Sequence, residues 1–418
     1  MSAIGLDIGT TGICGIVMNS GTGAIEKVVS RKNDFWIAGE PWERLQDPEA
    51  VFETASGILD ELRGGDTEAI GVTGQMHGIL YFDRCGRSVS PLYTWQDGRG
   101  NLSLDGETYA EKLGSHTGYG NVTHFYNKKN NLIPRDAVGF CTIHDYAVMR
   151  LTGRNTPLVH ASDAASFGCF DIKANRFTRT DDMQPQVTPD AEIAGRWQGI
   201  PVSAAIGDNQ ASFFGGGCDE NTVLINVGTG SQISLISDAE DECGALEIRP
   251  LTNGKCIAVG SSLCGGRAYA LLERFFAQTA RMAGVKKDEL YSEMAREIAD
   301  MKDTDLKFET LFCGTRENPK SRAKITQLSA DNFTPADMIF ACLAGISDEL
   351  FGMYESAGRK CTRMVGTGNG IRRNPVLQRI VEKQFGMRLQ IPKFEEEAAA
   401  GAAVFALAAA GARKILMI

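Results

Sequence analysis

The sequence has no hydrophobic run long enough to cross a membrane. Its most apolar stretch, residues 398–412, is shorter than the roughly 20 residues that a membrane helix needs, and it is rich in alanine and glycine. We therefore expect a closely packed interior helix there and no membrane partner. The N-terminus runs directly into a predicted strand, without the basic and apolar segments of a secretory signal, so we expect a cytoplasmic location.

Disulfide and zinc patterns are also missing. The 11 cysteines include no C-x-x-C pair, and the neighbouring Cys256 and Cys264 have no histidine at zinc-site spacing. We expect reduced thiols, most of them in the core. The 5 histidines show no cluster with a reactive serine or cysteine, so the sequence indicates no histidine as a general base.

Basic patches and the commonest nucleotide loops are absent too. The net charge is −9 and no basic stripe compensates for it, which argues against a nucleic-acid partner. The P-loop pattern G-x-x-x-x-G-K-[ST] does not occur, and Gly228 and Gly230 lack the third glycine of a dinucleotide-binding fingerprint. The 418 residues, 43% hydrophobic and 23% charged, are typical of a globular protein with two domains of roughly 200 residues each.

Two similar glycine–threonine turns are present, one in each half of the chain. They read Asp7-Ile8-Gly9-Thr10-Thr11-Gly12 and Asn226-Val227-Gly228-Thr229-Gly230-Ser231. Each turn lies between two apolar, β-favouring runs and so predicts a β-hairpin. Backbone N–H groups and hydroxyls in such turns suit phosphate oxygens without lysine or arginine. Either turn alone fits an ordinary β-turn, whereas the pair indicates an internal duplication that grips one polyphosphate between two domains.

The two turns differ in one charge. Asp7 precedes the first turn, where Asn226 precedes the second. Mg²⁺ that keeps most of its waters binds one or two carboxylates together with phosphate oxygens. Asp7 is therefore a candidate outer-shell metal partner.

A second carboxylate, Asp208, follows a predicted strand at residues 202–206 and Gly207. We set the domain boundary just after this junction. In phosphoryl transfer, an aspartate in such a position orients the attacking hydroxyl and accepts its proton. A plain helix N-cap explains the residue equally well locally, so both interpretations stay open.

Polar and aromatic groups follow two predicted strands of the first half, at residues 69–73 and 91–95. They include Gln75, Met76, His77, Trp95 and Asp97. An aromatic face, an amide, an imidazole and a carboxylate form the mixture that polyhydroxylated sugars require. A core tryptophan and a simple strand cap are the alternatives.

A glycine-rich turn follows a predicted strand near the end of the chain. Its residues Gly366, Gly368 and Asn369 would let the base and ribose of a nucleotide approach the backbone ahead of a helix N-terminus. Any glycine-rich strand-to-helix turn has a similar pattern, so this interpretation depends on the paired turns.

The periodicity of apolar residues predicts further helices at residues 48–62, 142–151, 268–283, 340–358 and 376–385. A final helix would carry acidic residues 395–397 in its first turn and Arg413 and Lys414 at its end, which favours its dipole. We predict a loop at residues 118–134 and an irregular hairpin at residues 164–177.

Taken in order, these motifs resemble the FGGY carbohydrate kinases, a branch of the actin, Hsp70 and hexokinase superfamily. The resemblance covers nearly the whole chain. Residues 7–12 and 226–231 are similar to the two phosphate motifs of the family, residues 366–370 to its adenosine motif, and residues 207–210 to the segment with its catalytic aspartate. Gly401-Ala402 is similar to its closing helix.

The sugar-side segments, residues 74–78 and 94–99, are similar to those of the ketose kinases. Together with residues 144–146, 164–166 and 207–212 they look most like the sedoheptulokinases, and next like the xylulokinases. The chain is shorter than many members, and its segment after Gly118 lacks the tryptophan-rich helix start of the pentulose kinases.

The resemblance implies an α/β fold of two actin-like (ribonuclease H-like) domains around a cleft, with sugar held mainly by residues 1–212 and ATP by residues 213–418. It implies transfer of the γ-phosphoryl group from ATP, with Mg²⁺, to a terminal primary hydroxyl of a ketose. Asp208 would be the base, and Asp7 and Asp208 would support the metal. The implied substrate-binding residues are Gln75, Met76, His77, Trp95, Asp97 and Asn209. The implied ATP-binding residues are Gly9, Thr10, Thr11, Gly12, Gly228, Thr229, Gly230, Ser231, Gly366, Gly368 and Asn369.

Sedoheptulose is the expected acceptor, and xylulose or another ketose or polyol is the alternative among enzymes. A different class of protein, a non-catalytic actin-like nucleotide switch, would turn over ATP slowly and without a sugar. That alternative gives Trp95, Asp97 and His77 no role. A homodimer is left open.

Overall fold

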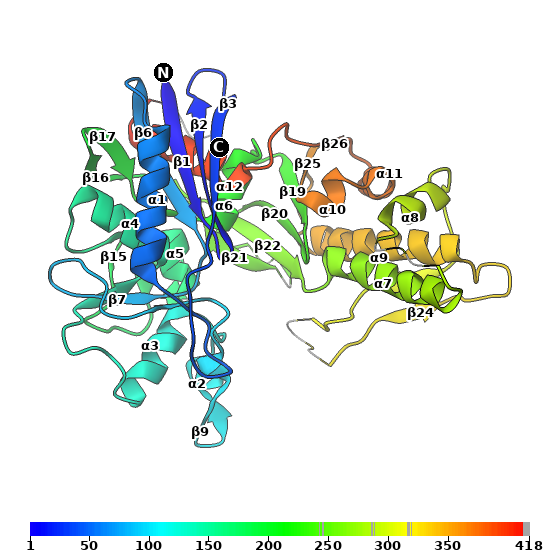
Figure 1. Ribbon diagram of the computed structural model, residues 1–418, viewed down its shortest axis with the longest axis horizontal. Helices are drawn as coiled ribbons and strands as arrows, with labels where there is room; N and C mark the ends of the chain where they lie inside the picture. Colours follow the sequence, from blue (N-terminus) through cyan, green and yellow to red (C-terminus); the bar gives the residue numbers. More distant parts are fainter. Residues whose placement is uncertain are drawn as a thin grey trace.

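The computed structural model describes residues 1–241, 243–244, 246–285, 287, 289–315, 318 and 320–412. In Figure 1 the chain forms two lobes side by side, each built around a sheet with helices against it. The first lobe lies at the left of the figure, and the second lobe, at the right, carries helices α7, α8 and α9.

The first sheet has its strands in the order β16–β17–β6–β1–β2–β3, with β18 also paired to β6. The bounds are β1 (Ser2–Ile8), β2 (Gly12–Asn19), β3 (Ile25–Lys32), β6 (Thr67–Gly74), β16 (Ile193–Trp197), β17 (Ile200–Ser203) and β18 (Ile206–Gly207). Strand β1 is antiparallel to β2 and parallel to β6, and β2 is antiparallel to β3. The first predicted hairpin is therefore confirmed, and it forms the centre of the sheet.

The second sheet repeats this plan, with the order β21–β22–β20–β19–β25–β26. The bounds are β19 (Thr222–Val227), β20 (Ser231–Ser237), β21 (Glu247–Pro250), β22 (Cys256–Ser262), β25 (Arg363–Thr367) and β26 (Leu389–Gln390). Strand β19 is antiparallel to β20 and parallel to β25, and β20 is antiparallel to β22. The duplication that the turns indicate thus extends to the strands around them.

Amphipathic helices cover the sheets. On the first sheet α1 (Pro48–Leu62) buries Val51, Ala55 and Ile58, and α4 (Ile143–Thr152) packs against β6. In the second lobe α7 (Gly265–Met282), α9 (Pro335–Ser356) and α11 (Pro375–Phe385) share one hydrophobic core with strands β19 and β20. These five helices lie where the periodicity predicts them, within a few residues at their ends.

Two helices connect the lobes, because each packs against the sheet of the other lobe. Helix α6 (Asp208–Gly215) follows the last strand of the first sheet, but its Phe213 shares a core with Leu224 and Ile257 of the second sheet. Helix α12 (Glu397–Ala409) follows the last strand of the second sheet, but it packs on β1 and β6 of the first. The helices also pack on each other, so they form the junction between the lobes.

Glycines allow the close approach at this junction. A Cβ atom added to Gly401 of α12 would lie 1.7 Å from the carbonyl oxygen of Ala211 in α6, and one added to Gly5 of β1 would lie 1.8 Å from the carbonyl oxygen of Ala399. Neither position has room for a side chain. The alanine-rich composition of this helix therefore reflects tight packing inside the protein, as predicted.

Shorter elements complete the lobes. The helices are α2 (Tyr109–Leu113), α3 (Gly120–Lys129), α5 (Ala161–Ser166), α8 (Tyr291–Glu297), α10 (Asn369–Arg372) and the 3₁₀ turn η1 (Gly98–Asn101). The strands are β4 (Trp36–Ile37), β5 (Leu45–Gln46), β7 (Leu80–Phe82), β8 (Leu92–Tyr93), β9 (Ser103–Leu104), β10 (Glu107–Thr108), β11 (Gly139–Cys141), β12 (Leu158–His160), β13 (Phe170–Asp171), β14 (Arg176–Phe177), β15 (Gln186–Thr188), β23 (Lys307–Glu309) and β24 (Lys324–Thr326).

The structure corrects two of the predicted segments. The loop predicted at residues 118–134 is wrong, because α3 spans most of it. This helix buries polar side chains, among them Thr123, His124 and Asn127, so no apolar periodicity marked it. The predicted hairpin at residues 164–177 begins with α5, and only β13 and β14 pair as a hairpin.

Three further expectations concern termini, thiols and membranes. Glu396 is the N-cap of α12, so the only acidic residue in the first turn of this helix is Glu397. Arg413 and Lys414 lie outside the described residues.

All 11 cysteines are free thiols, as expected. Among the described residues, no helix combines the length and the apolar character needed to span a bilayer.

Candidate active site

The second glycine–threonine turn lies at the mouth of a large cavity in the second lobe. This cavity has a volume of about 990 Å³ and collects four of the predicted ATP-binding residues, Gly228, Thr229, Gly368 and Asn369. It is also lined by Tyr269 and Tyr291, whose rings stack with centroids 5.8 Å apart. A cavity of this size with aromatic walls suits the base and ribose of a nucleotide.

Backbone contacts hold the second turn in place. The N–H of Gly266 donates to the carbonyl oxygen of Gly228, and the N–H of Arg267 donates to that of Thr229, both at 2.9 Å. A Cβ atom on Gly266 would lie 2.3 Å from the Gly228 oxygen. Sequence reasoning missed these two residues, although the Gly-Gly-Arg start of an amphipathic helix was the available signal.

The second turn is also joined to the glycine-rich turn after β25. The Asn226 side chain donates to Thr367 Oγ1 at 3.0 Å, and a Cβ atom on Gly368 would lie 2.6 Å from the carbonyl oxygen of Val227. The other predicted residues of this group, Gly230, Ser231 and Gly366, lie in or beside these strands and do not line the cavity.

Side chains as well as the backbone hold the first turn, and the N–H of Asn33 donates to the carbonyl oxygen of Thr11 at 3.0 Å. The Asn33 amide donates to the carbonyl oxygen of Gly9 at 2.8 Å, and the Gln46 amide donates to that of Thr10 at 2.9 Å. The Thr10 hydroxyl donates to Gln75 Oε1 at 3.3 Å and accepts from Trp95 Nε1 at 3.0 Å. The predicted sugar-side residues Gln75 and Trp95 therefore contact the first phosphate turn directly.

The two candidate carboxylates lie near each other between the lobes. Burial, with the nearby charge of Asp208, raises the pKa of Asp7 to about 7, and the charge of His144 opposes this rise. Burial also raises the pKa of Asp208, against the opposing charges of Arg249 and His144. Each carboxylate is therefore within electrostatic reach of the other and of the same histidine.

The N-cap interpretation of Asp208 is wrong. Gly207 is the N-cap of α6, Asp208 is its first residue, and no side chain caps this helix end. The Asp208 carboxylate instead accepts a hydrogen bond of 2.9 Å from the Asn209 amide, and the Asn209 carbonyl accepts one of 3.1 Å from Gln232 Nε2. The side chain of Asp208 is thus oriented by contacts across the two lobes.

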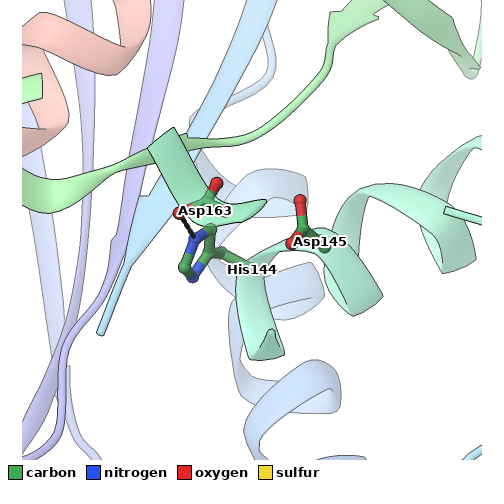
Figure 2. A group of neighbouring side chains, drawn as sticks. All are labelled: His144, Asp145 and Asp163. Atoms are coloured by element: carbon green, nitrogen blue, oxygen red, sulfur yellow. Dashed lines mark ion pairs between the residues drawn. The ribbon is translucent and has the colours of Figure 1, made fainter. Parts of the chain in front are cut away.

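A buried ion pair joins His144 and Asp163, as Figure 2 shows. His144 Nε2 is 2.9 Å from Asp163 Oδ1, and both side chains are fully buried. A Cβ atom on Gly74 would lie 3.2 Å from His144 Nδ1, so the imidazole sits directly behind the end of β6. The neighbouring negative charges of Asp163, Asp145 and Asp208 outweigh burial and raise the pKa of His144 to about 9.

This cluster also has the composition of a metal site. Ligand atoms of His144, Asp145 and Asp163 lie within 4.8 Å of one another. Within this cluster the imidazole Nε2 already faces Asp163 Oδ1 in an ion pair. We interpret the cluster as this buried ion pair, whose histidine lies within electrostatic reach of Asp7 and Asp208.

A small cavity has walls from both lobes, and Asp208 is not part of its lining. It has a volume of about 180 Å³, and its lining includes the predicted residues Met76 and His77. A Cβ atom on Gly207 would lie 2.6 Å from Met76 Cε, so this wall adjoins the residue before Asp208. Asn209, predicted to bind substrate, connects Asp208 to Arg249 of the same cavity lining.

His77 has an unusual backbone conformation. Its φ of +73° lies in the left-handed region, which a residue with a side chain adopts at a cost that functional sites often sustain. The conformation lets His77 Nδ1 reach the carbonyl oxygen of Ser166 at 2.9 Å, and the ring stacks on Tyr119 at 4.3 Å. The imidazole is therefore fixed against one wall of the cavity.

Asp97 is held by contacts within the first lobe. Its carboxylate is fully buried, pairs with Arg99 at 2.6 Å and accepts the backbone N–H of Arg44 at 3.1 Å. These contacts fix its loop, and Asp97 lines neither of the two cavities described above. Trp95 is 47% exposed, so the alternative of a core tryptophan is wrong.

Duplicated sheets, paired glycine–threonine turns, a nucleotide-sized cavity and two carboxylates within electrostatic reach of each other are typical of a two-lobed, actin-like phosphotransferase. The chain belongs to the FGGY family of carbohydrate kinases, because it matches the N-terminal domain of that family over residues 2–181 and the C-terminal domain over residues 223–410. It is therefore a sugar kinase, and kinases of this family use ATP as the phosphate donor. The predicted family is confirmed.

Named relatives agree with this membership. The chain is 28% identical to a sedoheptulokinase of Mus musculus, with 91% of this chain and 92% of the relative covered. It is 26% identical to a xylulose kinase of Escherichia coli over 56% of this chain and 54% of that relative. A solved xylulose kinase of Rhodospirillum rubrum superposes with a TM-score of 0.81 at 20% identity, over 98% of this chain and 91% of that one. This superposition confirms the predicted actin-like fold.

Proposed function

We propose that this kinase transfers the γ-phosphoryl group of ATP to the terminal primary hydroxyl of a ketose, with sedoheptulose as the favoured acceptor. The observation that carries the proposal is Asp208, a partly buried carboxylate that caps no helix. It is joined through Asn209 to Arg249, which lines a small cavity between the lobes. In this role it would accept the proton of the attacking hydroxyl.

The orientation of Asp208 supports a role as base. The Asn209 side-chain amide donates to Asp208 Oδ1 at 2.9 Å, which orients the carboxylate. His144, held as a cation by Asp163, lowers the proton affinity of both carboxylates against the effect of burial. A base must be ionised to accept a proton, so the buried ion pair favours the working state of Asp208.

The donor side follows from the two turns. We propose that the cavity at Gly228 and Gly368 holds the nucleotide, and that Gly9, Thr10, Thr11 and Gly12 of the first turn approach its terminal phosphates. Backbone donors that are fixed before the reaction stabilise the charge that develops on the transferred group. The Thr10 hydroxyl, tied to Gln75 and Trp95, would link the phosphate site to the sugar side.

Mg²⁺ fits the carboxylate pair. Burial, with the nearby charge of Asp208, raises the pKa of Asp7 to about 7, and a divalent cation would favour the ionised form of both carboxylates. We propose that Asp7 and Asp208 hold it, directly or through water. When bound, the ion would offset the negative charge of the phosphates.

The choice of sedoheptulose rests on the relatives. Those named sedoheptulokinase match along about nine tenths of the chain, whereas the Escherichia coli xylulose kinase matches little more than half of it. Xylulose is the second candidate, because solved xylulose kinases share the fold throughout. We propose residues 1–212 as the sugar-binding domain and residues 213–418 as the ATP-binding domain, with α12 packed back on the first sheet.

The test is ADP release from MgATP by the purified protein with sedoheptulose, xylulose, ribulose, fructose and glycerol in turn. Release that depends on sedoheptulose would support the full proposal. Release with another sugar would retain the kinase mechanism and replace the acceptor. ATP turnover that is independent of every sugar would contradict the proposed acceptor chemistry.

A further inference from the structure

We infer that Arg249 of the second lobe binds the acceptor sugar and is a specificity-determining residue of this kinase. The inference deepens the proposed function and rests on it, since it assigns a contact for the polyhydroxylated acceptor. Arg249 lies on the edge strand β21, and none of the sequence motifs includes it.

The small cavity has walls from both lobes. The first lobe contributes Met76, His77 and Ser166, and the second contributes Glu247 and Arg249. Its volume of about 180 Å³ is below the range of about 300–1,000 Å³ that is usual for drug-sized ligands, so it suits a small acceptor. An acceptor bound there contacts the second lobe as well as the predicted sugar residues.

Arg249 has an unsatisfied donor in this wall. Its side chain is 8% exposed, Nη2 donates to Glu247 Oε2 at 2.7 Å, and Nη1 contacts Asn209 Oδ1. Its Nε is buried and has no hydrogen-bond partner among the described residues. A buried guanidinium N–H without an acceptor is unfavourable, and a hydroxyl or carbonyl oxygen of a sugar would satisfy it.

Arg249 is also connected to the candidate base. Asn209 accepts from Arg249 through Oδ1 and donates to Asp208 Oδ1 through its amide at 2.9 Å. A sugar that engages Arg249 therefore acts on the residue that orients Asp208. Since Arg249 and Asp208 come from different lobes, this contact gives the acceptor a means to favour the closed arrangement in which transfer occurs.

A second contact joins the two lobes at the same cavity. The Tyr119 hydroxyl donates to Glu247 Oε1 at 3.5 Å, and the Tyr119 ring stacks on His77. Glu247 in turn anchors Arg249. The acceptor cavity is thus framed by an aromatic pair from the first lobe and an ion pair from the second.

The test compares Arg249→Lys and Arg249→Ala with the wild type. Lysine retains the charge but lacks the planar fork and the Nε donor, so it cannot reproduce both contacts. We expect the KM for the active sugar to rise about ten- to hundred-fold in both variants, with the KM for ATP within about twofold of the wild type. The matched control is Arg359→Lys, which alters an arginine paired with Asp238 and Asp241 elsewhere in the second lobe and should leave both KM values unchanged.

A rescue experiment separates sugar binding from a merely structural role. Millimolar methylguanidinium should restore sugar-dependent turnover to Arg249→Ala at least several-fold and should have no effect on the wild type. Thermal unfolding of each variant, with Glu247→Gln as a milder change to the same ion pair, identifies variants that fail to fold. If Arg249→Lys unfolds, Glu247→Gln must raise the sugar KM by itself for the inference to stand.

The outcomes also separate this inference from the proposed function. A wild type that phosphorylates no ketose overturns the proposed acceptor, and Arg249 is then tested by calorimetric titration of the same polyols into wild type and variants. Unchanged sugar KM, or unchanged polyol binding, in folded Arg249 variants overturns the inference while the kinase activity stands. A rise in the KM for ATP equal to that for sugar overturns it as well.

Discussion

The two glycine–threonine turns have the same strand context and different surroundings. The turn between β1 and β2 is held by one backbone bond, from the N–H of Asn33 to the carbonyl oxygen of Thr11, and by the side chains of Asn33, Gln46 and Trp95. The turn between β19 and β20 is held by backbone groups at the start of α7. Duplication therefore provided one backbone design twice, and the residues packed around each copy decide which ligand it serves.

The two turns also differ in the charge of the residue that precedes them. Asn226 is neutral and donates to Thr367, which closes the second turn onto the nucleotide cavity. Asp7 lies near Asp208 with the charged His144 behind them. We infer that the second turn serves to bind the donor, and the first turn serves the chemical step and the acceptor.

The largest expected effect is that of Asp208→Asn. Removing the base should lower kcat by about 10²–10⁴-fold, and ATP affinity should change little because the nucleotide cavity lies in the second lobe. Steady-state kinetics and calorimetric titration of ATP check this. Asp47→Asn, which changes a true helix cap, is the control and should leave kcat unchanged. Loss of ATP binding together with activity would contradict the division of tasks.

Exchanging the two residues that distinguish the turns should give the next largest effects. Asp7→Asn should lower kcat about 10²-fold, because it removes charge from the reacting centre and leaves the nucleotide cavity intact. Asn226→Asp should raise the Kd for ATP about tenfold, because it removes the donor to Thr367 and brings a carboxylate near the phosphates. Kinetics and titration should separate the two variants, and identical profiles would show that the turns share one role.

Substitution of a glycine at each turn should reveal a smaller difference, in the free energy of unfolding and in ATP binding. A Cβ atom on Gly266 would lie 2.3 Å from the Gly228 oxygen, whereas the nearest contact of one on Gly12 is 3.6 Å. Gly266→Ala should therefore reduce the free energy of unfolding by about 1–3 kcal/mol and weaken ATP binding. Gly12→Ala should have less effect on both, as chemical denaturation would reveal. Equal destabilisation by the two changes would mean that the turns are packed alike.

The last effect that we predict is a pH dependence that arises in the first lobe. The pKa of His144 is about 9 in the folded protein and 6.5 in a free side chain, so the proton stabilises the fold. This contribution is fully present below pH 6.5 and is lost as the pH rises through 9. The raised pKa values of Asp7 and Asp145, both about 7, act at lower pH, so denaturant unfolding at pH 7.5, 8.25 and 9 isolates the histidine. In His144→Gln the loss of stability over this range should disappear, and its persistence would assign the effect to another group.

Local patterns in the sequence predicted much of this organisation. The two turns, the five long helices and the position of Asp208 after a strand could be identified because each depends on neighbouring residues. Helix α3 could not, since its buried face is polar and satisfies itself with partners far along the chain, such as Tyr81 for Asn127. The N-cap interpretation of Asp208 failed by one residue, which is within the usual uncertainty of helix ends.

Contacts between distant segments could not be predicted. Arg249 follows no recognisable motif, and only the fold brings it to Asn209. The ion pair of Asp97 with Arg99, two residues away, was also not predicted, because the sequence pattern does not show which group the carboxylate contacts. The role of Gly266 could not be predicted either, since a glycine is required there only because α7 meets the second turn in the folded protein.

Hydrogen exchange measured by mass spectrometry tests the division between the turns most directly. A non-hydrolysable ATP analogue alone should slow exchange at residues 226–231 and 366–374, and the active ketose alone should slow it at residues 74–78 and 166–168. With both ligands present, protection should extend to residues 7–12 and 247–249. Protection of the first-lobe segments by the nucleotide alone, or of the nucleotide cavity by the sugar alone, would contradict the account.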